Sequence, residues 1–139
     1  MRAWRPFGEA QDGLGARMKV NVQALLRWLA VFLWMGAIFA LSSIPSISTP
    51  FEGGYDFTFK KCAHMIAYGT LTALLFGALR IHMRHKGYAF LMALFVAVLY
   101  GFSDEWHQTF VPGREGTLRD VAIDAAGAVG AFLWLRSKA

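Results

Sequence analysis

Four stretches of mostly apolar residues alternate with short polar segments along the chain of 139 residues. They cover residues 28–44, 62–79, 88–102 and 121–135, and the first contains no charged residue. A helix needs roughly 20 mainly apolar residues to cross a bilayer, and a helix that is apolar on all sides offers no face to water. The pattern therefore predicts an all-α integral membrane bundle of four transmembrane helices, in preference to a soluble four-helix bundle.

The fourth stretch is the shortest and is interrupted by Asp124. It is rich in Ala and Gly, and such small residues let helices approach closely in lipid. We expect it to be a packed helix, within a transmembrane domain over residues 25–136 that follows an N-terminal segment over residues 1–24. The first stretch also resembles a cleaved signal peptide in its apolar character, but the segment before it is long for that role, so we favour its retention.

The positive charges predict the direction of the helices. Residues 1–27 contain five basic residues against two acidic ones, and residues 80–86 add two Arg and one Lys without an acidic residue. The segments over residues 45–61 and 104–120 are balanced and net acidic, respectively. Basic loops stay in the cytoplasm, so we expect both termini inside and these two segments outside. The expected location is the inner (plasma) membrane, with several spans.

Composition agrees with this interpretation and excludes others. Hydrophobic residues make up 56% of the chain and charged residues 17%, whereas soluble domains have about 45–50% hydrophobic and about 25% charged residues. An intrinsically disordered chain is excluded as well, because it would have low hydrophobicity and high charge. The lone cysteine, Cys62, cannot form an intramolecular disulfide. The topology accounts for the basic net charge of +5, so the lipid bilayer is the expected partner and nucleic acid is not.

Ten polar residues gather at the predicted outer ends of the last three helices and in the loop before the fourth. Within a helix, most are spaced three, four or seven apart, so they share one face. Ionisable residues in membrane spans are costly and usually face the bundle interior or a water-filled cavity. We therefore expect one site on the outer side. The residues are Lys61, His64, Tyr68, Asp104, Glu105, Gln108, Arg114, Arg119, Asp120 and Asp124.

These residue types suit several chemistries, and the pattern does not choose among them. His64, with a reference pKa near neutrality, can act as a general acid or base beside Asp104 and Glu105. The other seven can bind a substrate, and the arginines match a phosphate or carboxylate. Carboxylates with a histidine can also hold a divalent metal. Whether a metal or another cofactor binds, and whether the chain is an enzyme, stays open; a purely structural ion-pair network uses the same atoms.

Four motifs follow one another in the second half of the chain. They are K-x-x-H-x-x-x-Y from Lys61 to Tyr68, D-E-x-x-Q over residues 104–108, P-G-R over residues 112–114 and R-D-x-x-x-D-x-x-G-x-x-G over residues 119–130. In order and spacing the chain resembles the VanZ-like family of small membrane proteins, over about residues 20–135. Two positions differ: Lys60 stands where Asp often precedes the Lys, and Asp124 where Asn is also common, so an obligate metal ligand is not implied there.

The resemblance implies a four-helix membrane protein in the setting of bacterial glycopeptide (teicoplanin) resistance, and it implies no particular reaction. Our leading hypothesis is an outward-facing polar pocket that binds or modifies a cell-envelope component, such as a lipid-linked or anionic ligand. One alternative is a non-catalytic scaffold or envelope-assembly factor whose polar network is structural. Another is a small transporter or proton relay, motivated by His64 and Asp124, although the chain shows no internal repeat of the transporter kind.

Overall fold

The computed structural model describes residues 7–45, 54–114 and 116–138, and side chains from residue 21 onward except those of residues 54–58. Within this part the chain forms four α-helices and no strand: α1 (Phe7–Ser42), α2 (Gly54–His82), α3 (Lys86–Gln108) and α4 (Leu118–Ser137). The all-α prediction is therefore confirmed. The predicted N-terminal segment over residues 1–24 lies partly outside the described part of the chain. Residues 1–6 are not described, and the side chains are described only from residue 21.

Three of the helices contain segments that are long and apolar enough to cross a membrane. These segments are Asn21–Ser42 of α1, Phe59–His82 of α2 and Lys86–Gln108 of α3. The prediction of four apolar spans is thus confirmed for three. The 20 residues of α4 include four charged side chains, and α4 is not among the spanning candidates in the described part of the chain.

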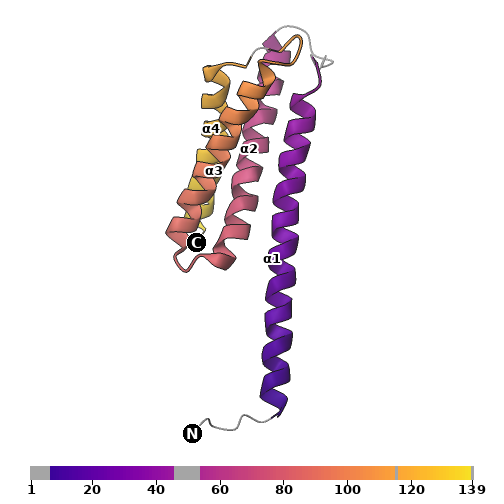
Figure 1. Ribbon diagram of the computed structural model, residues 1–139. Coiled ribbons are helices and arrows are strands. Elements are labelled where there is room, and N and C mark those ends of the chain that lie inside the picture. The colour runs from indigo at the N-terminus through magenta and orange to yellow at the C-terminus, as the bar shows by residue number, and fades with distance from the viewer. Residues whose placement is uncertain (1–6, 46–53, 115, 139) are drawn as a thin grey trace.

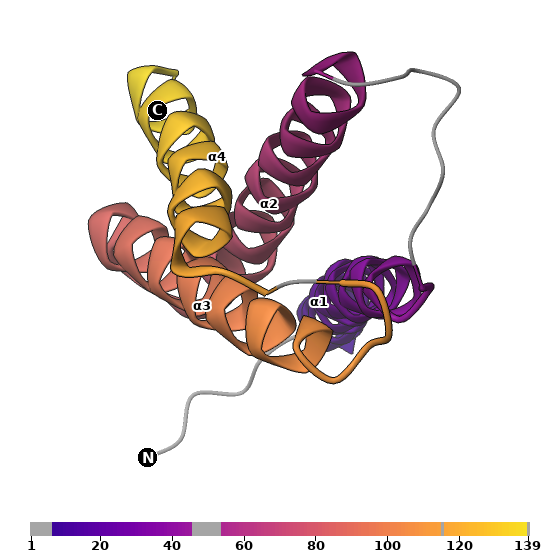
Figure 2. The same ribbon diagram turned by 90° about the horizontal axis from the view of Figure 1, so that it is seen from above.

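The helices α2, α3 and α4 pack on one another, and α1 lies beside them, mainly against α2 and more lightly against α3. Figure 2 shows α1 across from α4, on the other side of the bundle. At about 1.5 Å per residue, the 36 residues of α1 span about 54 Å. Its N-terminal half therefore extends beyond the other three helices (Figure 1).

Small residues allow the close packing of α3. Ala89, Ala93, Ala97 and Gly101 are spaced four apart and are all buried, so they form a stripe along which neighbouring helices approach. At the end of α3 near residue 86, the rings of Phe76 and Phe90 stack with their centroids 3.7 Å apart. The core thus runs along the seam of α2, α3 and α4.

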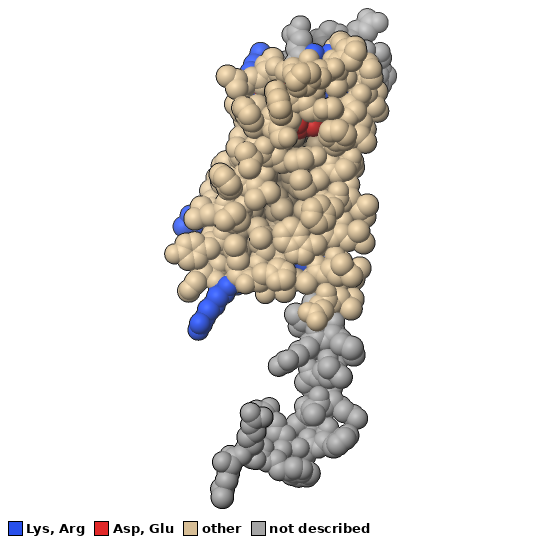
Figure 3. All heavy atoms as spheres, viewed as in Figure 1, with Lys and Arg blue, Asp and Glu red and all other residues tan. Residues whose placement is uncertain are grey.

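The outer faces of the helices are apolar. Large side chains such as Leu25, Phe32 and Leu33 of α1 and Phe95 of α3 are at least half exposed, and a soluble monomer rarely exposes contiguous apolar surface on this scale. In Figure 3 the Lys and Arg side chains lie toward the two ends of the described part, and the broad band between them is uncharged apart from an acidic side chain in a recess near the cavity end. This surface has the character that contact with lipid requires.

Two short connections complete the fold. The turn after α3 contains Gly113, whose φ of 78° is one that L side chains rarely adopt, as expected for the P-G-R turn. The residue before α4 is Thr117, whose side chain accepts a hydrogen bond from the Asp120 backbone N–H. This cap satisfies one of the free N–H groups of the first turn, and it brings the start of α4 beside the end of α3.

Candidate functional site

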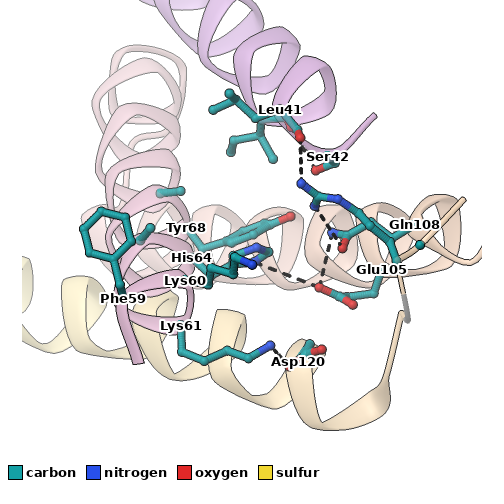
Figure 4. A pocket seen from close by; sticks show the side chains of 15 residues that line it. Leu41, Ser42, Phe59, Lys60, Lys61, His64, Tyr68, Glu105, Gln108 and Asp120 are labelled. Atoms are coloured by element: carbon teal, nitrogen blue, oxygen red, sulfur yellow. Dashed lines mark hydrogen bonds and ion pairs between the residues drawn. The ribbon is translucent and has the colours of Figure 1, made fainter. Parts of the chain in front are cut away.

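A cavity of about 340 Å³ lies at the end of the bundle where α1 and α3 finish and α2 and α4 start. Figure 4 shows polar side chains from α2, α3 and α4 pointing toward one another on one side of it, with the end of α1 opposite. Its lining residues are Ile38, Leu41, Ser42, Phe59, Lys60, Lys61, Ala63, His64, Ala67, Tyr68, Glu105, Gln108, Gly113, Arg114 and Asp120. The cavity is thus amphipathic: its apolar side chains come from α1 and α2, and its polar side chains come mainly from α2, α3, α4 and the loop between α3 and α4.

His64 links α2 to α4 and approaches α3. Its Nδ1 lies 3.0 Å from Asp124 Oδ1 and 4.0 Å from Glu105 Oε1. Because an ionised carboxylate only accepts hydrogen bonds, Nδ1 carries the proton when it faces an ionised Asp124. The other ring nitrogen is then free to exchange a proton with a ligand. This is the arrangement that a general acid or base needs.

Glu105 is held from two sides. Its Oε2 accepts a hydrogen bond from the Thr117 backbone N–H at 3.2 Å, and its Oε1 lies 3.4 Å from the Gln108 amide nitrogen. Gly116 passes directly over the end of α3, where a Cβ would meet the Glu105 carbonyl oxygen at 2.0 Å. Only glycine lets the chain come so close, and this approach positions the Thr117 N–H.

Asp104 connects α3 to α1. Its Oδ2 accepts from the Gln108 amide at 3.0 Å and from the Ser42 hydroxyl at 2.9 Å. The same hydroxyl also lies 2.9 Å from the Ile38 carbonyl oxygen, so its single hydrogen is shared between the two acceptors. Ser42 thereby ties the last turn of α1 to the polar cluster.

Arg114 closes the cavity from the loop side. Its Nε donates to the Ile44 carbonyl at 3.0 Å, its Nη2 to the Leu41 carbonyl at 2.9 Å, and its Nη1 to Gln108 Oε1 at 3.3 Å. These carbonyls belong to the C-terminal end of α1, which carries partial negative charge. A guanidinium has five N–H donors, so these three bonds do not exhaust it.

Lys61 forms an ion pair with Asp120 across α2 and α4, and both residues line the cavity. This pair lies nearer the helix ends than His64, as Figure 4 shows. Asp120 also stands in the first turn of α4, where negative charge is favourable. The two starting helix ends are therefore joined by one electrostatic contact.

Three buried polar atoms have no hydrogen-bond partner among the described residues. They are the Tyr68 hydroxyl, Asp104 Oδ1 and Asp124 Oδ2. The three residues are 1–2% exposed and come from α2, α3 and α4. Buried polar atoms are normally satisfied, so each unsatisfied one calls for an explanation.

The expected gathering of residues is largely what the structure shows. Of the ten candidates, nine lie in or directly behind the cavity, with Asp104 and Asp124 behind its wall. Arg119 is the exception: it is exposed on the first turn of α4 and does not line the cavity. The structure does not test what any of them binds.

Two residues of the network were missed in the sequence. Ser42 is a single hydroxyl at the end of an apolar stretch and has no spacing partner. Thr117 could have been found, because T-x-x-D before an apolar run is a helix-capping pattern. Outside this network, the position of Trp34 in the middle of a span does not fit an aromatic belt at the membrane surface. The structure explains it: the Trp34 indole N–H donates a hydrogen bond to the Ala67 carbonyl at 3.0 Å and joins α1 to α2.

The fold and the site define a small helical protein with three segments that are long and apolar enough to span a membrane, and with a polar cluster beside a cavity at one end of its bundle. The chain belongs to the VanZ/LLP1 family, whose model matches residues 6–137. This confirms the resemblance seen in the motifs. Searches of the curated proteins and of the solved structures found no match.

Proposed function

We propose that this chain is a bacterial inner-membrane protein of four spans that binds an amphiphile with an anionic headgroup, a component of the cell envelope. The observation that carries the proposal is the amphipathic cavity. Lys60, Lys61 and Arg114 line it together with the acidic Glu105 and Asp120, so its charged lining has an excess of cations. Ile38 and Leu41 of α1 offer an apolar wall to a lipid chain.

The position of the cavity supports an outward-facing site. It lies at the opposite end of the bundle from Arg80, Arg84 and Lys86 (Figure 1), and basic loops favour the cytoplasm. A ligand would then enter from the outer leaflet. In Figure 3 an acidic side chain is visible in a recess near the cavity end, so polar groups are reachable from the side of the bundle as well as from its end.

In this proposal α4 is a fourth span despite its charges. Asp124 faces His64 inside the bundle and is 1% exposed, and the other charges of α4 stand within two residues of its ends. Charged residues at the ends of a span can reach the interface. α1 is retained, since it forms one wall of the cavity.

A pair of probes that differ only in charge tests the proposal. The full chain in detergent is mixed with a polyprenyl phosphate or with the uncharged polyprenol of equal length, and retained ligand is measured by native mass spectrometry. We expect selective retention of the phosphate, and at least about tenfold weaker retention by Lys61→Met, since one lost charge-assisted contact is worth about 1.5–3 kcal/mol. Lys86→Met, at the other end of the bundle, serves as the matched control and keeps retention.

The scaffold alternative gives a different result. If the network only clamps the helices, Lys61→Met lowers the melting temperature while phosphate and alcohol are retained equally. Equal retention by the unmodified chain alone is enough to reject the anionic-headgroup proposal. The alternative has its own support in the structure, because Arg114 binds the C-terminal end of α1 and Ser42, the last residue of α1, binds Asp104 of α3.

A further inference from the structure

Negative charge exceeds positive charge in the interior of the cluster. Asp104, Glu105 and Asp124 are buried, with 1–3% of each residue exposed. Across the described parts of the chain, His64 is the only cationic side chain within 4.0 Å of any of the three. A buried charge is costly unless it is paired or coordinates a metal. One histidine can neutralise only one of the three carboxylates, so the other two are either protonated or paired with a bound cation.

Three of these groups present ligand atoms toward a common point. A histidine nitrogen and one carboxylate oxygen each of Glu105 and Asp124 all lie within 4.8 Å of one another. The His64 nitrogen is 3.0 Å from the Asp124 oxygen and 4.0 Å from the Glu105 oxygen. Donors that share one zinc ion at about 2.1 Å in a tetrahedron are about 3.4 Å apart, so small side-chain movements would place all three around one ion.

Independent support comes from an unpartnered carboxylate oxygen. Asp124 is 1% exposed, and its Oδ2 has no hydrogen bond among the described residues although its Oδ1 faces His64. A bound cation, or water held by it, would satisfy this oxygen, whereas an ion pair of His64 with Asp124 Oδ1 alone leaves it unsatisfied.

The geometry points to a divalent-metal site formed by His64 Nδ1, Glu105 and Asp124. The metal replaces the proton that Nδ1 otherwise directs at Asp124, and the neutral ring then carries its proton on Nε2. One imidazole and two carboxylates suit Zn²⁺ or Mn²⁺, because imidazole favours zinc and carboxylates are good manganese ligands. Glu105 is oriented by Gln108 and by the Thr117 N–H, as outer contacts orient metal ligands. His64 and Glu105 also line the cavity, so the remaining coordination positions face the space where a ligand would lie.

The site is tested on the full chain without any amphiphile. The protein, purified in detergent, freed of its affinity tag and stripped with a chelator, is dialysed against micromolar Zn²⁺ or Mn²⁺. Bound metal is measured by mass spectrometry, and Mn²⁺ also by electron paramagnetic resonance. We expect about one equivalent per chain, and a metal-dependent rise in melting temperature, since a ligand that binds only the folded state stabilises it.

Conservative variants separate binding from folding. Asp124→Asn keeps an acceptor for His64 and Glu105→Gln keeps the size of the side chain, but each removes a ligand charge. We expect each to lose at least about tenfold in metal affinity, while the melting temperature of the stripped protein stays the same or rises because repulsion is relieved. His85→Asn, an exposed histidine at the other end of α3, is the matched control and keeps the metal.

The site is overturned if the unmodified chain shows no stoichiometric uptake, or if uptake survives in both carboxylate variants. Uptake lost in the His85 control as well would mean adventitious binding by surface histidines and would likewise reject it. Because no amphiphile is present, the metal site and the headgroup proposal fail separately. If the chain binds metal but does not prefer polyprenyl phosphate over polyprenol, the metal site is supported and the headgroup proposal is rejected.

Discussion

Gly127 lies where α4 crosses α2 so closely that a side chain has no room. A Cβ there would meet the backbone oxygen of Met65 at 2.3 Å, and backbone atoms cannot move aside as a flexible side chain can. We predict that Gly127→Ala lowers the free energy of unfolding by about 1–3 kcal/mol, the usual cost of overpacking. Thermal unfolding in detergent, followed by circular dichroism, measures this loss.

Gly130 provides the control on the same helix. A Cβ at this position meets nothing within 4 Å, and alanine is the better helix former by about 1 kcal/mol. Gly130→Ala should therefore leave the melting temperature unchanged or raise it. Equal effects of the two substitutions would contradict the close crossing of α2 and α4.

At the residue scale, the helix faces that carry the site were predictable from the sequence, whereas the contacts between residues of different helices were not. The spacing of Lys61, His64 and Tyr68 placed them on one face of α2, and all three line the cavity. Spacing within a helix cannot show which residue of another helix lies opposite. The pairing of His64 with Asp124, and of Lys61 with Asp120, depends on how α2 and α4 are rotated about their axes.

The attachment of α1 belongs to the scale of the element, because α1 makes fewer contacts with the bundle than the other helices do. Two of the bonds at its C-terminal end come from Arg114, to the carbonyls of Leu41 and Ile44. Hydrogen bonds to a charged group are worth about 1.5–3 kcal/mol. We predict that Arg114→Met speeds hydrogen exchange at the Ser43 and Ile44 amides by about tenfold or more, since about 1.4 kcal/mol corresponds to tenfold.

Arg114→Lys gives the matched comparison. It keeps the charge but cannot fork between two carbonyls, so exchange should rise to an intermediate rate. Amides around Val31, in the buried middle of α1, should exchange as before. Uniform acceleration along all helices would show general destabilisation and would contradict a local role of Arg114.

Element boundaries were less predictable than the elements themselves. The first apolar stretch predicted a span from residue 28, whereas α1 begins at Phe7, because residues 7–20, in which charged and apolar residues are mixed, continue the helix without continuing the apolar pattern. The start of α4 at Leu118 is explained by the Thr117 cap, a signal that apolar periodicity does not contain. The small-residue character of α4 did indicate a packed helix, and Gly127 shows how close that packing is.

At the scale of the whole molecule, the cavity end and the opposite end differ in the balance of their charges. Around the cavity, basic and acidic side chains occur together and form ion pairs. The opposite end has Arg80, Arg84 and Lys86 close together, and the structure shows no acidic residue within residues 80–86. Such unbalanced basic charge is what keeps a loop in the cytoplasm.

Labelling at two exposed positions tests the resulting orientation. In a Cys62→Ala background, a cysteine replaces His85 in one protein and Pro112 in another; Gly113 is avoided because its φ is 78°. A membrane-impermeant maleimide applied to intact cells should react at position 112 and not at position 85, and both should react once the membrane is opened. If the basic charges determine the orientation, adding Arg84→Gln and Lys86→Gln to the protein with a cysteine at position 85 should produce a mixture of two orientations, so that position 85 becomes partly reactive in intact cells. If Arg84 and Lys86 are intact and only the cysteine at position 85 is labelled in intact cells, the cavity lies in the cytoplasm, where an outer-leaflet headgroup cannot reach it.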